Sequence, residues 1–160
     1  MNSDKHVLSI LVENYAGTLS KVAGLFTRRG YNIDTLNVAE TIDPKISRII
    51  VTVTGDKDVL EQITKQLNKL INVIKITDLT LKKSILKEFM FLKISCNKEN
   101  RSEILEASSV FKAKTVNITA KSIIFEITGD EDKNNAFIEL MRPYGIIEIV
   151  RTGLTAIERS

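Results

Sequence analysis

The sequence predicts an α+β protein made of two tandem ferredoxin-like βαββαβ units, each with an antiparallel sheet and two helices on one face. Apolar residues at period two and at helical spacing give the order β-α-β-β-α-β twice along the 160 residues. The pentapeptide TGDKD at 54–58 recurs as TGDED at 128–132, each time between a predicted strand and a predicted helix. We therefore place two domains at residues 1–82 and 83–160.

The first half supplies its six elements in order. Alternation predicts strands at residues 7–13, 33–41, 47–54 and 73–81. The first helix begins near Ala16, follows an apolar stripe through Leu19, Val22, Ala23 and Phe26, and ends at Gly30, which allows a left-handed stop. The second helix opens at Gly55 and Asp56, and its stripe comprises Leu60, Ile63, Leu67 and Leu70.

The second half repeats this order less clearly. It predicts strands at 89–96, 115–119, 122–128 and 146–152, with helices at 101–111 and 134–144. The aspartates of the repeated pentapeptide stand where they can cap the free N–H groups of the helix that follows.

One face of the first predicted sheet has no helix to cover it. That face carries Val7, Leu11 and Ile50. An apolar face on so small a unit implies a cover, which could be the other half of the chain, a second copy or another protein. We expect the chain to be at least a homodimer through its N-terminal half.

Composition and charge exclude several classes of protein. Hydrophobic residues make up 43%, charged residues 27%, and the net charge of +3 is spread along the chain without a basic stripe. The single cysteine excludes an internal disulfide framework, and there is no membrane-length apolar run or apolar signal core. These features predict a cytoplasmic protein without a nucleic-acid or membrane partner.

Few residues could support catalysis or metal binding. His6 and Cys96 are single and far apart, whereas a metal site needs several converging ligands. We interpret His6 as a surface residue, the acids Asp56 and Asp58 as helix caps, and Phe89 and Phe91 as core residues rather than an RNA-binding pair. No catalytic and no metal site is predicted.

The stretch ENYAGTLSKVAGLFTRRGYNIDTLNV at 13–38 is the best candidate for a binding site. The first N–H groups of its helix form a positive end suited to a carboxylate or phosphate, and Gly17 leaves room for a ligand. Asn14 offers a donor and an acceptor there, and Asn32 could add the same from the far end of the helix or from a neighbouring subunit. From the residues alone, a cap at Asn14 and a turn at Asn32 remain the simpler interpretation.

The same stretch closely resembles the ACT domain that opens the small, regulatory subunit of acetolactate synthase (acetohydroxyacid synthase). The segments SRIIVTVTGD and LEQITKQLNKLINVIKI resemble that family too, and EFMFLKI and IIEIVRTG extend the similarity more weakly into the second half. The resemblance covers nearly the whole chain and identifies residues 1–82 as an ACT regulatory domain and residues 83–160 as the C-terminal domain of the small subunit.

This resemblance implies regulation of another enzyme. Family members carry no active site; they bind a catalytic large subunit that holds thiamine diphosphate, magnesium and FAD and makes acetolactate from two molecules of pyruvate. They raise its activity and confer feedback inhibition by valine. Because the catalytic subunit holds the cofactors, none is expected in this chain. The effector preference among valine, leucine and isoleucine stays open.

Effectors of this family bind between two ACT domains, which the resemblance transfers to a set of residues at the two ends of the first helix. These are Asn14, Ala16, Gly17, Thr18 and Leu19 of one copy and Asn32 and Ile33 of the other. The alternative function is a stand-alone amino-acid-binding ACT regulator of another enzyme or of transcription, which the lack of a basic helix-turn-helix disfavours.

Overall fold

The computed structural model describes residues 5–80 and 83–160. The chain forms two compact units, described separately below. The N-terminal unit contains the residues up to Leu86 together with Gly153–Ser160, and the C-terminal unit is Lys87–Thr152. The predicted domain boundary after residue 82 lies outside the described residues and stays a prediction.

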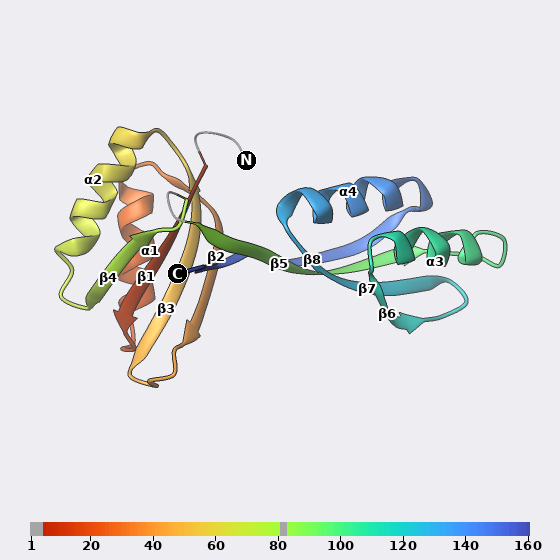
Figure 1. Ribbon diagram of the computed structural model, residues 1–160, viewed down its shortest axis with the longest axis horizontal. Coiled ribbons are helices and arrows are strands. Elements are labelled where there is room, and N and C mark those ends of the chain that lie inside the picture. Colours follow the sequence, from red (N-terminus) through yellow and green to blue (C-terminus); the bar gives the residue numbers. More distant parts are fainter. Residues whose placement is uncertain (1–4, 81–82) are drawn as a thin grey trace. The chain divides into compact units, whose positions relative to one another are not determined.

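The N-terminal unit is a four-stranded antiparallel sheet with two helices on one face (Figure 1). The strand order is β2-β3-β1-β4, so that β2 and β4 are the edges. Apolar side chains of both helices meet the inward residues of the strands in one core, which includes Leu8, Phe26, Val51 and Ile63. The elements are β1 (Lys5–Glu13), α1 (Thr18–Arg28), β2 (Asn32–Glu40), β3 (Ile46–Thr54), α2 (Lys57–Asn68) and β4 (Val73–Asp78).

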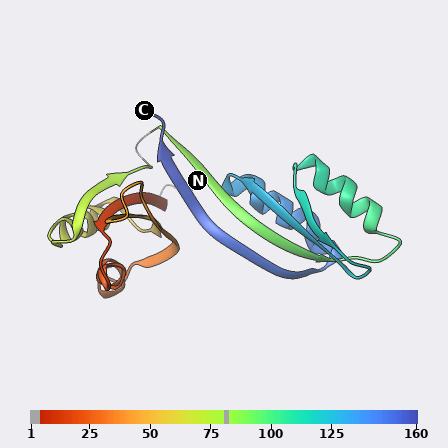
Figure 2. The ribbon, with the colours of Figure 1, turned by 90° about the horizontal axis from the view of Figure 1, so that it is seen from below.

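The C-terminal unit repeats this architecture, with both helices on one side of its sheet (Figure 2). Its strand order is β6-β7-β5-β8. Its core joins the two helices to alternate residues of the strands, among them Leu92, Ile104, Phe125 and Phe137. The elements are β5 (Ser84–Ser95), α3 (Arg101–Val110), β6 (Lys114–Ile118), β7 (Ser122–Gly129), α4 (Glu131–Met141), a short 3₁₀ turn (Arg142–Tyr144) and β8 (Ile146–Glu158).

The predicted fold class is therefore confirmed, and so is the role of the repeated pentapeptide. The Asp56 carboxylate accepts a hydrogen bond from the Val59 N–H at 3.0 Å, and Asp130 accepts one from the Lys133 N–H at 2.8 Å. Each aspartate thereby caps the helix that follows it. Gly30 has φ +75°, the left-handed conformation expected at the end of α1.

Strand β8 is longer than predicted, and its extension covers the outer face of the N-terminal sheet. Leu154 lies with Val7, Ile50 and Leu79 in a small apolar cluster, against which Leu86 and Ala156 pack. Val7 and Ile50 are thus covered by the end of β8 of the same chain. Because both residues are almost fully buried, this face no longer argues for a second copy.

A glycine makes this close approach of β8 possible. Gly153 has φ +78°, and a Cβ there would lie 2.4 Å from Thr35 Cβ. The Asn37 side-chain amide donates to the Leu154 carbonyl at 2.9 Å, which fixes the strand next to β2.

Two predicted side-chain environments are wrong. Phe89 and Phe91 are not in the core but stack edge to face with each other, 4.8 Å between ring centres, on the sheet face away from the helices. His6 is not a surface residue: it is buried in β1, and its Nε2 lies 3.1 Å from the Gly55 carbonyl oxygen.

Candidate effector-binding site

The N-terminus of α1 is not capped by any side chain. Gly17 occupies the cap position with φ +86°, and the first turn contains no acidic residue. An added Cβ at Gly17 would meet no atom within 4 Å. The positive helix end thus has open space beside Gly17, and the glycine is needed for its backbone conformation.

Asn14 does not cap this helix, contrary to the simpler interpretation of its sequence position. Its side-chain amide donates to the Pro44 carbonyl at 3.0 Å and lies 3.4 Å from Glu40 Oε1. Its own N–H donates to the Lys45 carbonyl at 2.8 Å. These bonds hold Asn14 against the β2–β3 hairpin, exposed beside the entrance of α1.

The next predicted site residues divide between the surface and the interior. Ala16 and Leu19 are exposed, so that Leu19 offers an apolar contact beside the helix end. Thr18 is buried, and its Oγ1 accepts a hydrogen bond of 3.4 Å from the Asn72 side-chain amide. Thr18 therefore supports the turn from inside, and its backbone N–H donates to the Tyr15 carbonyl at 3.2 Å, so that neither group is open to a ligand.

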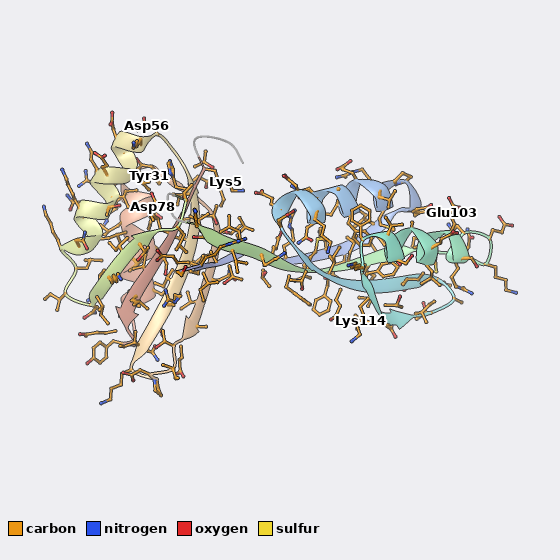
Figure 3. The ribbon with its side chains drawn as sticks, in the orientation of Figure 1. Lys5, Tyr31, Asp56, Asp78, Glu103 and Lys114 are labelled. Carbon is orange, nitrogen blue, oxygen red and sulfur yellow. The ribbon has the colours of Figure 1, made fainter. Side chains whose placement is uncertain are left out.

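Asn32 and Ile33 lie at the opposite end of the same unit. Asn32 pairs with Thr54 of β3, which pairs with Lys5, whereas Glu13 pairs with Ile46 at the far end. Figure 3 labels Lys5, Tyr31 and Asp56 at the Asn32 end of the sheet. The nine residues of β1 span about 26 Å at about 3.3 Å per residue, so one copy cannot hold a small ligand with both asparagines.

The neighbours of Asn32 and Ile33 are well packed. Ile33 contacts the core of the N-terminal unit, while Asn32 is exposed. The Tyr31 ring lies over Gly55, where an added Cβ would be 2.7 Å from the ring. Burial, and secondarily Asp56, raises the pKa of Tyr31.

Sequence reasoning missed two residues of this region, Glu40 and Asn72. Glu40 ends β2 beside Asn14, and Asn72 supports Thr18 from the loop before β4. Both lie more than 20 residues from their partners along the chain, and no local pattern marks such contacts.

The described residues offer no cluster of three or more His, Cys, Asp or Glu that could hold a metal ion. The most buried carboxylate, Glu88, is tied into an ion pair with Arg151 at 2.6 Å and also receives the Asn134 amide. Among residues 5–80 and 83–160, no helix is both long and apolar enough to span a bilayer.

The comparisons with known proteins agree with this architecture. The family model described as an AHAS small subunit-like ACT domain matches residues 8–75, and the model described as the small subunit of acetolactate synthase matches residues 87–160. The fold and the open helix end thus define an ACT-domain protein of the regulatory type.

Individual relatives specify the family. A protein of Archaeoglobus fulgidus named "Probable acetolactate synthase small subunit" is 47% identical over 97% of both chains. The acetolactate synthase small subunit of Mycolicibacterium smegmatis is 42% identical over 96% of this chain and 91% of its own. The crystal structure of the acetolactate synthase small subunit from Thermotoga maritima matches with a TM-score of 0.88 at 37% identity, covering 98% of each chain. The chain belongs to the acetolactate synthase small-subunit family.

Proposed function

We propose that this chain activates the catalytic large subunit of acetolactate synthase and makes it sensitive to valine, the end product of branched-chain amino-acid synthesis. Thiamine diphosphate, magnesium and FAD belong to that catalytic subunit, and the complex works in the cytoplasm. Membership of the small-subunit family supports the partner. The uncapped, accessible N-terminus of α1 supports an effector with a carboxylate.

The effector site is formed by two copies of the chain, in a homodimer paired through β2. This strand is an edge of its sheet and exposes Leu36 and Val38. In an antiparallel pairing of two β2 strands about a twofold axis, Asn32 at the start of one strand lies near Glu40 at the end of the other. Because Glu40 contacts Asn14 in its own chain, Asn32 of one copy approaches the helix entrance of the second.

This arrangement gives a zwitterionic amino acid complementary partners. Its carboxylate would accept hydrogen bonds from N–H groups of the first turn of α1 beyond Thr18, whose own N–H already donates to the Tyr15 carbonyl. Its ammonium would lie among the oxygens of Asn14, Glu40 and the partner's Asn32, and Leu19 would contact a small apolar side chain. The side chains of Asn14, Leu19, Asn32 and Glu40 are all exposed, which supports this assignment.

Reconstitution with the native catalytic subunit tests the proposal. The chain alone, given pyruvate, thiamine diphosphate, magnesium and FAD, should make no acetolactate, because its buried acid Glu88 is committed to an ion pair. Added to the catalytic subunit, it should raise the rate of acetolactate formation and introduce inhibition by valine. A reconstituted enzyme that is neither faster nor valine-sensitive would contradict the proposal.

A further inference from the structure

The outer face of the N-terminal sheet, away from α1 and α2, carries a polar hollow of ≈ 190 Å³. Strands β1, β3 and β4 form its floor, and the end of β8 borders it. Pockets for drug-sized ligands measure roughly 300–1,000 Å³, so this hollow suits a smaller molecule. The polar residues that line it are Ser9, Arg48, Lys75, Thr77 and Glu158.

The strand register brings two cations to this hollow. Leu11 of β1 pairs with Arg48 of β3 on one side and with Lys75 of β4 on the other. Residues that pair across neighbouring strands point to the same face of a sheet. Neighbouring strands lie about 4.8 Å apart, so the Cα atoms of the two cationic residues are about 10 Å apart. Side chains of this length can place both charged groups over Leu11.

A buried hydroxyl holds one of the two cations beside the hollow. Ser9 is 2% exposed, and its Oγ accepts a hydrogen bond from Arg48 Nη1 at 2.6 Å. This bond directs the guanidinium toward Ser9 and leaves further N–H groups of Arg48 as donors. Thr77, which pairs with Ser9 across β1 and β4, adds a second hydroxyl to the lining.

The charges of the hollow are not balanced within the chain. Lys114 and Arg151 have carboxylate partners at 3.8 and 2.6 Å, whereas no ion pair involves Arg48 or Lys75 among residues 5–80 and 83–160. Of the described residues that line the hollow, only Glu158 carries a carboxylate. Two cations against one carboxylate leave the hollow positive. Neighbouring like charges repel each other, and an anion between them offsets that repulsion.

We propose that this hollow binds one small oxyanion, a phosphate or carboxylate group of a low-molecular-weight ligand. The Arg48 guanidinium and the Lys75 ammonium hold the anion with charge-assisted hydrogen bonds, and the Thr77 hydroxyl donates another. The site is separate from the proposed effector site, because it lies on the sheet face opposite α1. Its floor does not include β2, so it stays open in a pair of chains joined through that strand.

Titration of the ¹⁵N-labelled full chain with inorganic phosphate, followed by NMR, tests the site. The backbone amide signals of Ser9, Arg48 and Thr77 should shift and saturate at millimolar phosphate, and sodium chloride at equal ionic strength should not reproduce the shifts. Arg48→Met and Lys75→Met should each raise the phosphate dissociation constant about tenfold or more, because each removes a charge-assisted hydrogen bond. Lys65→Met, the matched control, changes an exposed lysine of another cationic cluster on α2 and should leave that constant unaltered.

Two further variants separate a built site from general positive charge. Arg48→Lys keeps the charge without the planar guanidinium, so its phosphate dissociation constant should lie between those of the wild type and Arg48→Met. Glu158→Gln removes the carboxylate from the lining and should tighten phosphate binding. Equal dissociation constants in Arg48→Met and Lys65→Met would overturn the proposal.

A parallel titration with acetate identifies the oxyanion. Saturable shifts of the same amides with acetate would assign the hollow to a carboxylate, and shifts with phosphate alone would assign it to a phosphate group. Absence of saturable shifts with both anions would overturn the proposal. If Arg48→Met then abolished stimulation of the catalytic subunit, the hollow would bind an acidic side chain of that subunit rather than a small ligand. Valine inhibition should persist in every variant, which keeps this test distinct from that of the effector site.

Discussion

At the scale of single residues, the two asparagines differ in what they do without a ligand. Asn14 is held by Pro44 and Glu40, whereas no side-chain hydrogen bond is seen for Asn32 among the described contacts. A hydrogen bond to a charged group contributes about 1.5–3 kcal/mol, and about 1.4 kcal/mol corresponds to a factor of ten. We therefore expect Asn14→Ala or Asn32→Ala to raise the valine concentration for half-inhibition about ten- to a hundredfold.

The measurement is a valine titration of the reconstituted enzyme, with Asn68→Ala on the exposed surface of α2 as the matched control. Activation of the catalytic subunit should largely persist in all three variants. If Asn32→Ala left the inhibition curve unchanged in an intact complex, Asn32 would be a turn residue only.

Gly17 permits a test that separates charge from backbone strain. Any side chain at φ +86° is strained, so Gly17→Ala measures that cost alone. Gly17→Asp adds a carboxylate that can cap α1, which should make the chain more stable than the alanine variant. The same carboxylate occupies and repels the place of the ligand carboxylate, so that valine inhibition should be lost more completely than in Gly17→Ala. Equal inhibition in the two variants, in the same titration, would argue against an anion at this helix end.

The residue scale also shows where prediction from the sequence fails. The start of the helix at Gly17 could be predicted, because the glycine and the helical stripe are local features. The absence of a side-chain cap could not, since a cap at Asn14 was the simpler interpretation. The partners of Asn14 could not, because Pro44 and Glu40 lie 30 and 26 residues away. Phe89 and Phe91 were assigned to the core wrongly because residues 89–92 are all apolar, and such a run does not reveal which face of a strand is buried.

At the scale of elements, periodicity predicts nearly every helix and strand, because each buries one face against a single core. The end of β8 was missed. Leu154 and Ala156 follow the alternation expected of a strand. The residues that they cover, Val7 and Ile50, lie about 150 and 100 positions earlier in the sequence. A sequence pattern can show that a face needs a cover without showing which segment supplies it.

The contact of β8 with β2 gives a prediction for stability. Gly153→Ala places a Cβ against Thr35 in a left-handed conformation, so the end of β8 must lift from the sheet and expose Val7 and Ile50. The expected loss is about 2 kcal/mol or more of the free energy of unfolding, measured by urea denaturation. Gly24→Ala is the matched control: its Cβ would be 4.0 Å from the Arg28 guanidinium within α1, and helix propensity predicts a gain of about 0.5–1 kcal/mol. Equal effects of the two substitutions would show that β8 does not depend on this close approach.

At the scale of the whole molecule, the proposed effector site links ligand binding to association. Asn14 and Asn32 lie at opposite ends of one N-terminal unit, and only a second copy can bring them to the same ligand. A ligand that binds the dimer and not the monomer must stabilise the dimer, by mass action.

The size of this linkage can be calculated. With two equivalent sites, valine at ten times its dissociation constant should lower the dimer dissociation constant about a hundredfold, since each site contributes a factor of about eleven. Sedimentation of the wild-type chain over a range of concentrations, with and without valine, measures this shift, and glutamate serves as the control amino acid. Asn32→Ala should reduce the shift, while Asn68→Ala, the exposed control on α2, should leave it intact. Valine that binds without changing the dissociation constant would place the whole site within one copy, against the arrangement across β2.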